Sequence, residues 1–246
     1  MRNGLVVMMA VVLMGVVAQP VSAADVTATA DMNSAYVWRG MTLNDGLVIQ
    51  PSIDITKGGF GFNVWGNFDV QDYGDRIDSR EFSEIDLAAS YTFNLGSTNL
   101  GVGYIEYLFP TTDSGGAPGT REIYGSLGVP LPAGFSMVLD LFWDIDEIND
   151  IYLNLAFDYS YAFTDQLNLG AGVSIAYAGD EYCFDGSAGL YDYNFSISMG
   201  YTIDAALSVS AFIKYTDSLD DDNLAEGGFG MLDVNLYGGV GVSYDF

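Results

Sequence analysis

Apolar and polar residues alternate along most of this chain with a period of two. In residues 84–93, Leu87 and Phe93 belong to the apolar set, whereas Glu84 and Asp86 belong to the polar set. Successive side chains of a β-strand point to opposite faces, so this alternation predicts strands with one apolar and one polar face. No helical periodicity interrupts the alternation after residue 24. The pattern therefore predicts an all-β protein.

Twelve alternating segments follow one another, and the connections between them differ in length. We predict the strands at residues 26–39, 45–56, 59–70, 82–93, 99–109, 121–129, 135–144, 151–161, 167–177, 190–201, 206–215 and 232–246. Short turns alternate, on the whole, with longer loops between these segments. Strands of about ten residues, in an even number, with short turns at one end, are typical of a bacterial transmembrane β-barrel. We therefore predict a closed antiparallel transmembrane β-barrel of about 12 strands, with both termini on the short-turn, periplasmic side.

Aromatic residues gather near both ends of the predicted apolar face. Amphipathic rings are favoured at the two membrane–water interfaces, where they form girdles around a barrel. The candidate membrane-interface residues are Trp38, Trp143, Tyr201, Tyr244 and Phe246. A soluble exported β-sandwich or lipocalin-like barrel also alternates and is the alternative. It is disfavoured because the polar face holds almost no lysine, which water-facing sheets use at their edges.

The first residues have the order of a secretory signal peptide. Arg2 is followed by an apolar stretch over residues 5–17 and by small residues at 21–24. This order predicts cleavage beside Ala23 or Ala24. A membrane anchor is the alternative, but the apolar core is shorter than the roughly 18 residues that a spanning helix needs. We expect a signal peptide over residues 1–24, one barrel domain over residues 25–246, and export to the outer membrane.

Charge and composition exclude several classes of function. The chain has 33 acidic residues against 7 lysines and arginines, a formal net charge of −26, and no histidine. Nucleic-acid binding requires a basic surface, so it is excluded. The absence of histidine excludes Ser-His-Asp and Cys-His catalysis and histidine-ligated zinc, so we expect neither an enzyme nor a cofactor. The single cysteine, Cys183, is expected on an external loop.

The polar face supplies the candidate residues of a barrel lumen. Unpaired carboxylates cost several kcal/mol each to bury, and two basic side chains do not neutralise so many acids. We therefore expect a hydrated lumen that enriches cations. The alternative to this open lumen is a closed interior with trapped water. We expect Arg39 to pair with Glu84 or Asp86, either at a constriction or as a structural ion pair. The lumen and selectivity candidates are Arg39, Asp54, Asp69, Glu84, Asp86, Glu122, Asp140, Asp158, Asp192 and Lys214.

Three features depart from the simple alternation or lie outside it. Pro51 lacks a backbone donor, which predicts a bulge or local distortion in its strand. Glu106 is in phase with the apolar face, so we expect a bulge near residues 104–105 that turns it inward. Acidic loops are weak candidates for divalent-ion sites that bridge to lipopolysaccharide phosphates, and a solvated charge run is the plainer interpretation. The weak metal candidates are Asp217, Asp220, Asp221 and Asp222.

Several stretches resemble the TorF-type porin family of exported bacterial proteins. They are SAYVWRGMT at residues 34–42, GGFGFNVWGNFD at 58–69, GYIEYLFP at 103–110 and REIYGSLGV at 121–129. The resemblance implies an outer-membrane porin-like barrel and brings no established substrate or binding residues. The aromatic end at Phe246 also resembles the signal by which the barrel-assembly machinery recognises outer-membrane proteins.

Two functions fit these observations. The first is a passive outer-membrane channel for small hydrophilic solutes with a preference for cations. The alternative is a non-conducting structural or adhesive barrel whose acidic external loops bind divalent ions. Both place the barrel in contact with outer-membrane lipid and lipopolysaccharide. A membrane-embedded enzyme is the weakest hypothesis because the chain lacks histidine.

Overall fold

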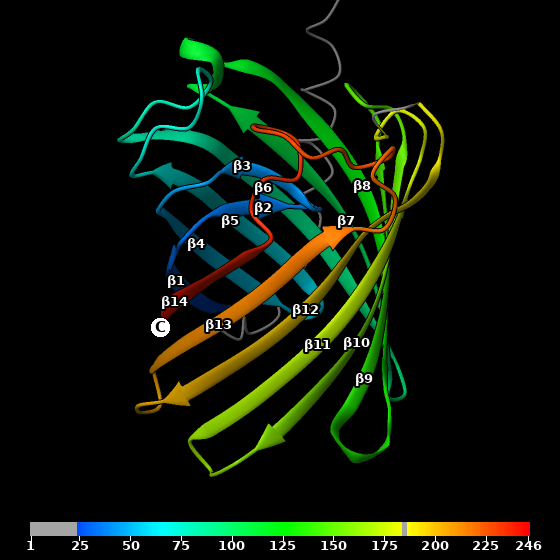
Figure 1. Ribbon diagram of the computed structural model, residues 1–246. Helices are drawn as coiled ribbons and strands as arrows, with labels where there is room; N and C mark the ends of the chain where they lie inside the picture. The colour runs from blue at the N-terminus through cyan, green and yellow to red at the C-terminus, as the bar shows by residue number, and fades with distance from the viewer. Residues whose placement is uncertain (1–23, 184–185) are drawn as a thin grey trace, which may run out of the picture.

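The computed structural model describes residues 24–183 and 186–246. The predicted signal peptide therefore lies, except for residue 24, outside the described residues. In the described part of the chain, twelve strands form one closed antiparallel barrel in the order β1-β14-β13-β12-β11-β10-β9-β8-β7-β6-β5-β4 (Figure 1). β1 pairs with β14 on one side and with β4 on the other, which closes the sheet. The predicted closed all-β barrel is confirmed.

In the described part of the chain, two short strands are not part of the barrel wall and form a separate two-stranded sheet. They are β2 (Tyr36–Trp38) and β3 (Met41–Asn44). The strands of the wall are β1 (Asp25–Asn33), β4 (Val48–Lys57), β5 (Phe60–Asp69), β6 (Glu81–Leu95), β7 (Thr98–Phe109), β8 (Ala117–Pro130), β9 (Phe135–Asp144), β10 (Ile151–Ala162), β11 (Leu167–Ala178), β12 (Gly189–Thr202), β13 (Leu207–Ser218) and β14 (Leu236–Asp245). The described residues also form two 3-10 turns, η2 (Thr112–Ser114) and η3 (Pro132–Gly134). Among the described residues, no helix is long and apolar enough to cross a membrane.

The two ends of the barrel differ in the length of their connections. At one end, here called the turn end, the strands are joined by the short segments 58–59, 96–97, 131–134, 163–166 and 203–206. At the other, the loop end, the connections are 34–47, 70–80, 110–116, 145–150, 179–188 and 219–235. The N-terminus of β1 and the C-terminus of β14 meet at the turn end, where the amide of Phe246 donates to the carbonyl of Val26 at 3.0 Å.

The apolar positions of the alternation face outward from the barrel. In β12, Phe195 is 53% exposed and Ile197 is 71% exposed, whereas Asn194 is partly buried. The register carries this alternation around the wall, because Phe195 stands opposite Val173 of β11 and Tyr215 of β13. The outer surface of the barrel is therefore apolar, and the polar positions line its interior.

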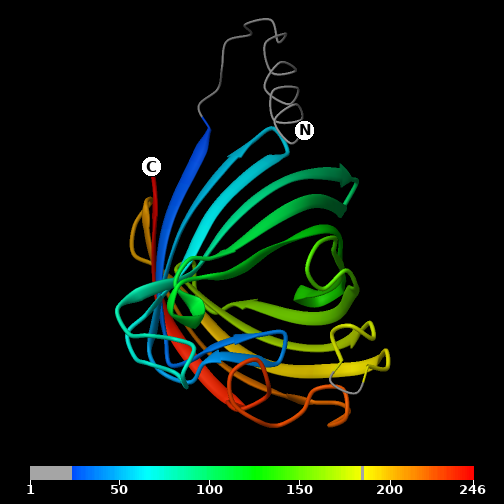
Figure 2. The same cartoon turned by 90° about the horizontal axis from the view of Figure 1, so that it is seen from above.

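The predicted first strand is too long, because part of it belongs to the first connection, residues 34–47. That strand was expected to run to residue 39, but β1 ends at Asn33. The chain then folds inside the barrel as the β2–β3 hairpin, which is blue in Figure 2. Its turn has positive φ at Arg39 and Gly40, of 50° and 77°. A Cβ at residue 40 would overlap Leu224, so this turn requires glycine.

The two predicted irregularities have different outcomes. At Pro51 the β4–β5 ladder is interrupted between the pairs Ile49–Phe68 and Ser52–Trp65, and the register is unchanged. This is the predicted local distortion, without a bulge. The bulge predicted near residues 104–105 is absent from the described β7, and the prediction for Glu106 is wrong, because Glu106 pairs with outward-facing Leu87.

Glu106 remains on the outer face because Arg121 of β8 compensates its charge. The Nε of Arg121 donates to both carboxylate oxygens of Glu106 at 3.1 and 3.2 Å. Tyr104 also donates its hydroxyl to this carboxylate. Arg121 forms a second ion pair with Asp146 of the loop that follows β9, at 3.1 Å. An outward acid is tolerated here because it is paired with a base from the neighbouring strand.

Candidate functional site

The β2–β3 hairpin reaches across the lumen and is fastened to β8. Arg39 at its tip forms a bidentate ion pair with Glu122, with Nη1–Oε1 and Nη2–Oε2 distances of 2.6 and 2.8 Å. The side chains of Arg39 and Glu122 are 7% and 0% exposed. The prediction that Arg39 pairs with Glu84 or Asp86 is wrong. The hairpin places Arg39 beyond β6, on which both acids lie, and close to β8.

Aromatic rings enclose this ion pair. The guanidinium carbon of Arg39 lies 4.3 Å from the ring centre of Trp38 and 4.5 Å from that of Tyr152. Tyr107 and Tyr182 each donate a hydroxyl to Glu122, at 2.9 Å. Burial acts to lower the pKa of Arg39, but the hydrogen bonds and charge of Glu122 outweigh it and raise that pKa above its ordinary value. Arg39 therefore stays charged.

Trp38 does not lie at the membrane interface, contrary to the prediction from sequence. Its ring packs edge-on against Tyr107 of β7, with 6.0 Å between the ring centres, inside the barrel. The prediction failed because it extended the first strand through Trp38 and assigned the residue to the outer face by alternation. The other four aromatic candidates lie on the outer surface. The exposed fractions are 47% for Trp143, 40% for Tyr201, 47% for Tyr244 and 80% for Phe246.

A hydrophobic cluster fills the loop end of the barrel next to the hairpin. It includes Tyr152 of β10, Tyr191 of β12, and Cys183 and Leu224 from two loops. Tyr191 is turned inward where the register between β11 and β12 shifts. Cys183 lies on the expected external connection, but its side chain is buried, with 7% exposed. The cluster packs against Trp38 and Met41, so it supports the hairpin inside the lumen.

Further acids of the lumen are held by hydrogen bonds to neutral side chains. Tyr36 of the hairpin donates to Glu84 Oε2 at 3.0 Å. Burial and the Glu84 carboxylate raise the pKa of Tyr36 well above its ordinary value, so the phenol remains a donor at neutral pH. Asp192 accepts from Tyr152 and from Asn194, each at 2.6 Å. These bonds fix the carboxylates near the hairpin in defined orientations.

Asp69 and Asp86 are less fully paired than Glu122. Asp69 Oδ1 accepts from Asn44 of β3 at 2.6 Å and from Asn67 at 3.0 Å. Among the described residues, Asp69 Oδ2 and Asp86 Oδ1 are buried without a hydrogen-bond partner. Asp86 stands on β6 two positions from Glu84, on the same inward face. The wall of β5 and β6 therefore carries buried acidic oxygens that are not satisfied by hydrogen bonds from the described residues.

The lumen between the hairpin and the turn end is polar. One cavity of about 290 Å³ beneath the hairpin is bordered by Asp140, Asp192 and Lys214. A cavity of about 520 Å³ further toward the turn end is bordered by Asp158 together with serine, asparagine and glycine positions. Asp54 also lies in this half, where its Oδ1 accepts from Asn63 at 2.8 Å. The interior is thus open and polar toward the turn end and constricted at the hairpin.

The weak metal candidates do not form a site among the described residues. Asp217 accepts hydroxyl bonds from Tyr215 and Tyr193 at 2.6 and 3.2 Å. Asp220 accepts the backbone amide of Asp222 at 3.1 Å. In the part of the chain that is described, no three acidic or other metal-ligating side chains gather closely enough to hold an ion. Asp221 therefore does not complete a metal site either.

Sequence reasoning missed the side chains that surround Arg39. Tyr107, Phe142, Tyr152 and Tyr182 come from three strands and a loop, and only the closed barrel brings them together. The available signal was the Arg39-Gly40 step, which breaks the alternation and is typical of a tight turn. That step predicts a turn, but it gives no information on where the tip of the hairpin lies.

Comparisons with known proteins agree with this geometry. The model of a bacterial protein family of unknown function, Gcw_chp, matches residues 17–238. No curated protein matches the chain. The fold is similar to that of the KdgM porin solved with disordered oligogalacturonate, at 13% identity over 90% of this chain and 99% of that one, with a TM-score of 0.54.

Two further solved structures have the same fold. The NanC porin is 10% identical over 91% of this chain and 100% of its own, with a TM-score of 0.53. An outer membrane channel from Pseudomonas putida F1 is 14% identical over 93% of this chain and 97% of its own, with a TM-score of 0.55. At these identities the similarity establishes the fold, and it transfers no ligand.

Proposed function

Because the chain belongs to the Gcw_chp family of bacterial proteins and has the fold of outer-membrane porins, we propose that it is an outer-membrane channel. It allows passive diffusion of small hydrophilic solutes and prefers cations. The stretches at residues 34–42 and 58–69 support assigning it to the TorF-type porins. The proposal assigns it no enzymatic activity and no cofactor.

The charge of the lumen wall is the observation that carries this proposal. Asp54, Asp140 and Asp158 line the interior and are partly exposed to it. Of the described basic side chains, Lys214 and Arg39 reach this interior, and Glu122 balances the charge of Arg39. A water-filled passage with excess carboxylates enriches cations and repels anions. The polar cavities on the turn side of the hairpin support a hydrated passage.

The outer surface supports the membrane location. Leu155, Phe157 and Ile175 belong to the apolar outer wall, while Trp143 and Tyr201 mark its loop and turn ends. Aromatic girdles at the two interfaces fit outer-membrane lipid and lipopolysaccharide. In this orientation both termini are periplasmic. Phe246 on the outer surface then fits recognition by the barrel-assembly machinery.

A second candidate function is a non-conducting barrel, and the hairpin is the observation that favours it. Arg39 and its aromatic surroundings fill part of the cross-section near the loop end. If the hairpin seals the lumen, the acidic loops become the functional surface and solutes do not pass.

Conductance of the purified, refolded protein in planar bilayers tests the proposal. We expect discrete channel steps, and a reversal potential under a KCl gradient that indicates cation preference. Anion preference would contradict the selectivity. If the wild-type protein shows no steps while a variant with residues 34–47 replaced by a short glycine-serine link conducts, the hairpin is a plug and the second candidate is correct.

A further inference from the structure

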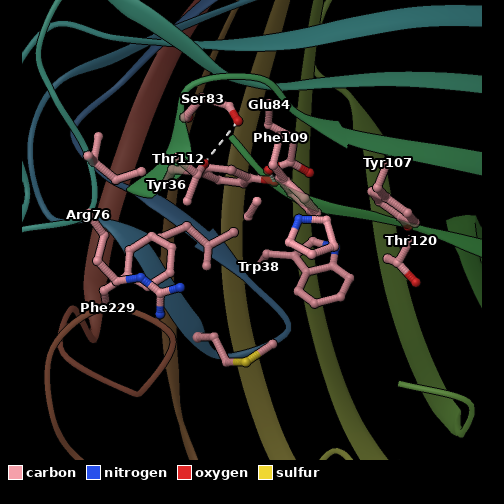
Figure 3. Close-up of a pocket in the computed structure, with 15 residues that line it drawn as sticks. Tyr36, Trp38, Arg76, Ser83, Glu84, Tyr107, Phe109, Thr112, Thr120 and Phe229 are labelled. Atoms are coloured by element: carbon pink, nitrogen blue, oxygen red, sulfur yellow. Dashed lines mark hydrogen bonds between the residues drawn. The ribbon is translucent and has the colours of Figure 1, made fainter. Parts of the chain in front are cut away.

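A third cavity lies at the loop end, on the other side of the hairpin from the two lumen cavities. It has a volume of about 210 Å³. Trp38 and Tyr107 border this cavity as well as the one beneath the hairpin, so these two side chains stand between the two spaces. Figure 3 shows its wall, with Trp38, Tyr107 and Thr120 on one side and Arg76 and Phe229 on the other. We call it the outer pocket.

Aromatic and apolar side chains form most of the wall of the outer pocket. Its aromatic residues are Tyr36, Trp38, Tyr107, Phe109 and Phe229. They come from the hairpin, from β7 and from the loop before β14, so the closed barrel and its loops are needed to assemble them. Each ring face carries negative electrostatic potential and attracts a cation.

One acidic side chain also lies on the wall of the outer pocket. Glu84 is 4% exposed, and its Oε2 accepts the hydroxyl of Tyr36. Among the described residues, no lysine or arginine forms an ion pair with Glu84. Asp86, next along the inward face of β6, has a buried oxygen without a hydrogen-bond partner. Buried acids without a counter-charge are costly, and a bound cation supplies that charge.

Arg76 at the mouth of the outer pocket is paired with Asp113 and not with Glu84. Its Nε and Nη2 donate to the two carboxylate oxygens of Asp113, both at 2.7 Å. Its guanidinium also lies 4.6 Å from the ring centre of Phe229. These contacts join the loops that follow β5, β7 and β13, so the mouth is formed before any ligand binds.

We propose that the outer pocket binds small organic cations, namely ammonium compounds with methyl or alkyl substituents. Several aromatic rings and an acidic side chain suit a substituted ammonium group, and the apolar side chains of Met41 and Leu43 suit its carbon atoms. A bare metal ion needs several oxygen ligands, and an anion finds no free base here, because Arg76 is already paired with Asp113. The volume exceeds the roughly 150 Å³ that accommodates a benzene-sized molecule.

This inference rests on the proposed channel function, because it names the class of solute that the loop end captures before passage. Binding is nevertheless measured separately from conduction. Channel steps without ammonium binding overturn the inference and leave the channel intact. Ammonium binding without channel steps overturns the channel and leaves the binding site intact.

The test is a calorimetric titration of the full mature barrel in detergent micelles with choline chloride. The matched probe is 3,3-dimethyl-1-butanol, which has the shape of choline without its charge. We expect choline to bind at least about tenfold more tightly than this alcohol, because the charge accounts for the attraction. We expect Glu84→Gln, which keeps the shape of the side chain, to weaken choline binding by about tenfold or more. Asp165→Asn removes one carboxylate from an exposed turn at the other end of the barrel and should leave the affinity unchanged.

A second variant keeps the inference testable if Glu84→Gln does not fold. Phe109→Leu retains an apolar side chain and removes a ring face from the wall, so we expect a several-fold loss of choline affinity with unchanged affinity for the alcohol. Equal affinities for choline and the alcohol overturn the inference. So does a folded Glu84→Gln barrel with wild-type affinity, since Glu84 would then be a neutral acid that shares its proton with Asp86.

Discussion

Arg39 at the tip of the β2–β3 hairpin holds Glu122 of β8 in a bidentate ion pair with distances of 2.6 and 2.8 Å. The hairpin starts from β1 and returns to β4, whereas β8 stands four strands away from β4 around the wall. The ion pair therefore fastens the free end of the hairpin to a distant part of the barrel. A loop that is held at both its base and its tip has a fixed position in the lumen, and this position sets the size of the constriction.

Arg39→Gln tests whether the ion pair holds the constriction. Breaking a buried ion pair by removing one partner costs about 3–5 kcal/mol, because the remaining charge is left uncompensated. We expect the hairpin to detach from β8 and the single-channel conductance to rise. The control is Arg121→Gln, which removes a guanidinium from the outer face. Wild-type conductance in a folded Arg39→Gln barrel would show that another contact holds the hairpin.

The acids between the hairpin and the turn end should set the selectivity. Asp140→Asn combined with Asp158→Asn removes two lumen charges and preserves side-chain shape. We expect the cation-to-anion permeability ratio to fall roughly by half or more, because the field of the lumen weakens. Reversal potentials under a KCl gradient measure this ratio. Glu106→Gln, on the outer face, is the matched control and should leave the ratio unchanged.

Alternation was sufficient to predict the barrel wall because a period of two is a local property. Phe195 and Ile197 face outward and Asn194 does not, and their spacing along the chain shows this directly. The boundaries of β9 were also predicted, since it occupies the expected residues 135–144. The inward orientation of the polar face follows from the same spacing once the outer face is known.

The constriction was not predictable, because it depends on contacts between distant residues. Arg39 and Glu122 are 83 positions apart, and alternation alone continued the first strand through the turn at Gly40. The prediction that Glu106 faces inward failed for a related reason. Whether an outward acid is compensated depends on the register between β7 and β8, which places Arg121 opposite it.

The pair of Arg76 and Asp113 gives a pH-dependent contact between loops outside the barrel wall. The hydrogen bonds from Arg76 lower the pKa of Asp113 below its ordinary value of 3.8. Because the carboxyl pKa is lowered in the folded state, the contact contributes stability above the ordinary pKa and loses it as pH falls through the lowered one. In Arg76→Gln, we expect the titration midpoint of Asp113 to rise toward its ordinary value, as measured by carbon NMR of the side-chain carboxyl.

The exposure of this pair limits the size of its effect on stability. Both side chains are more than two-fifths exposed, at 48% and 42%, and solvent screens their interaction. The global unfolding transition should therefore change little between pH 7 and pH 4 on account of this pair. An identical Asp113 midpoint in the wild type and in Arg76→Gln would show that the ion pair does not persist in solution.

The ion pair of Glu106 and Arg121 explains how an acid is tolerated on the outer face, and a double-mutant cycle tests the explanation. Arg121→Leu alone leaves the Glu106 carboxylate without its base on an apolar surface, so we expect a clear loss of stability against urea in lipid vesicles. Glu106→Leu combined with Arg121→Leu removes both charges and supplies two apolar side chains, so the double variant should be more stable than Arg121→Leu. If the effects of the two substitutions simply add, the charges do not interact in the membrane, and Glu106 must be solvated by lipid headgroups or water.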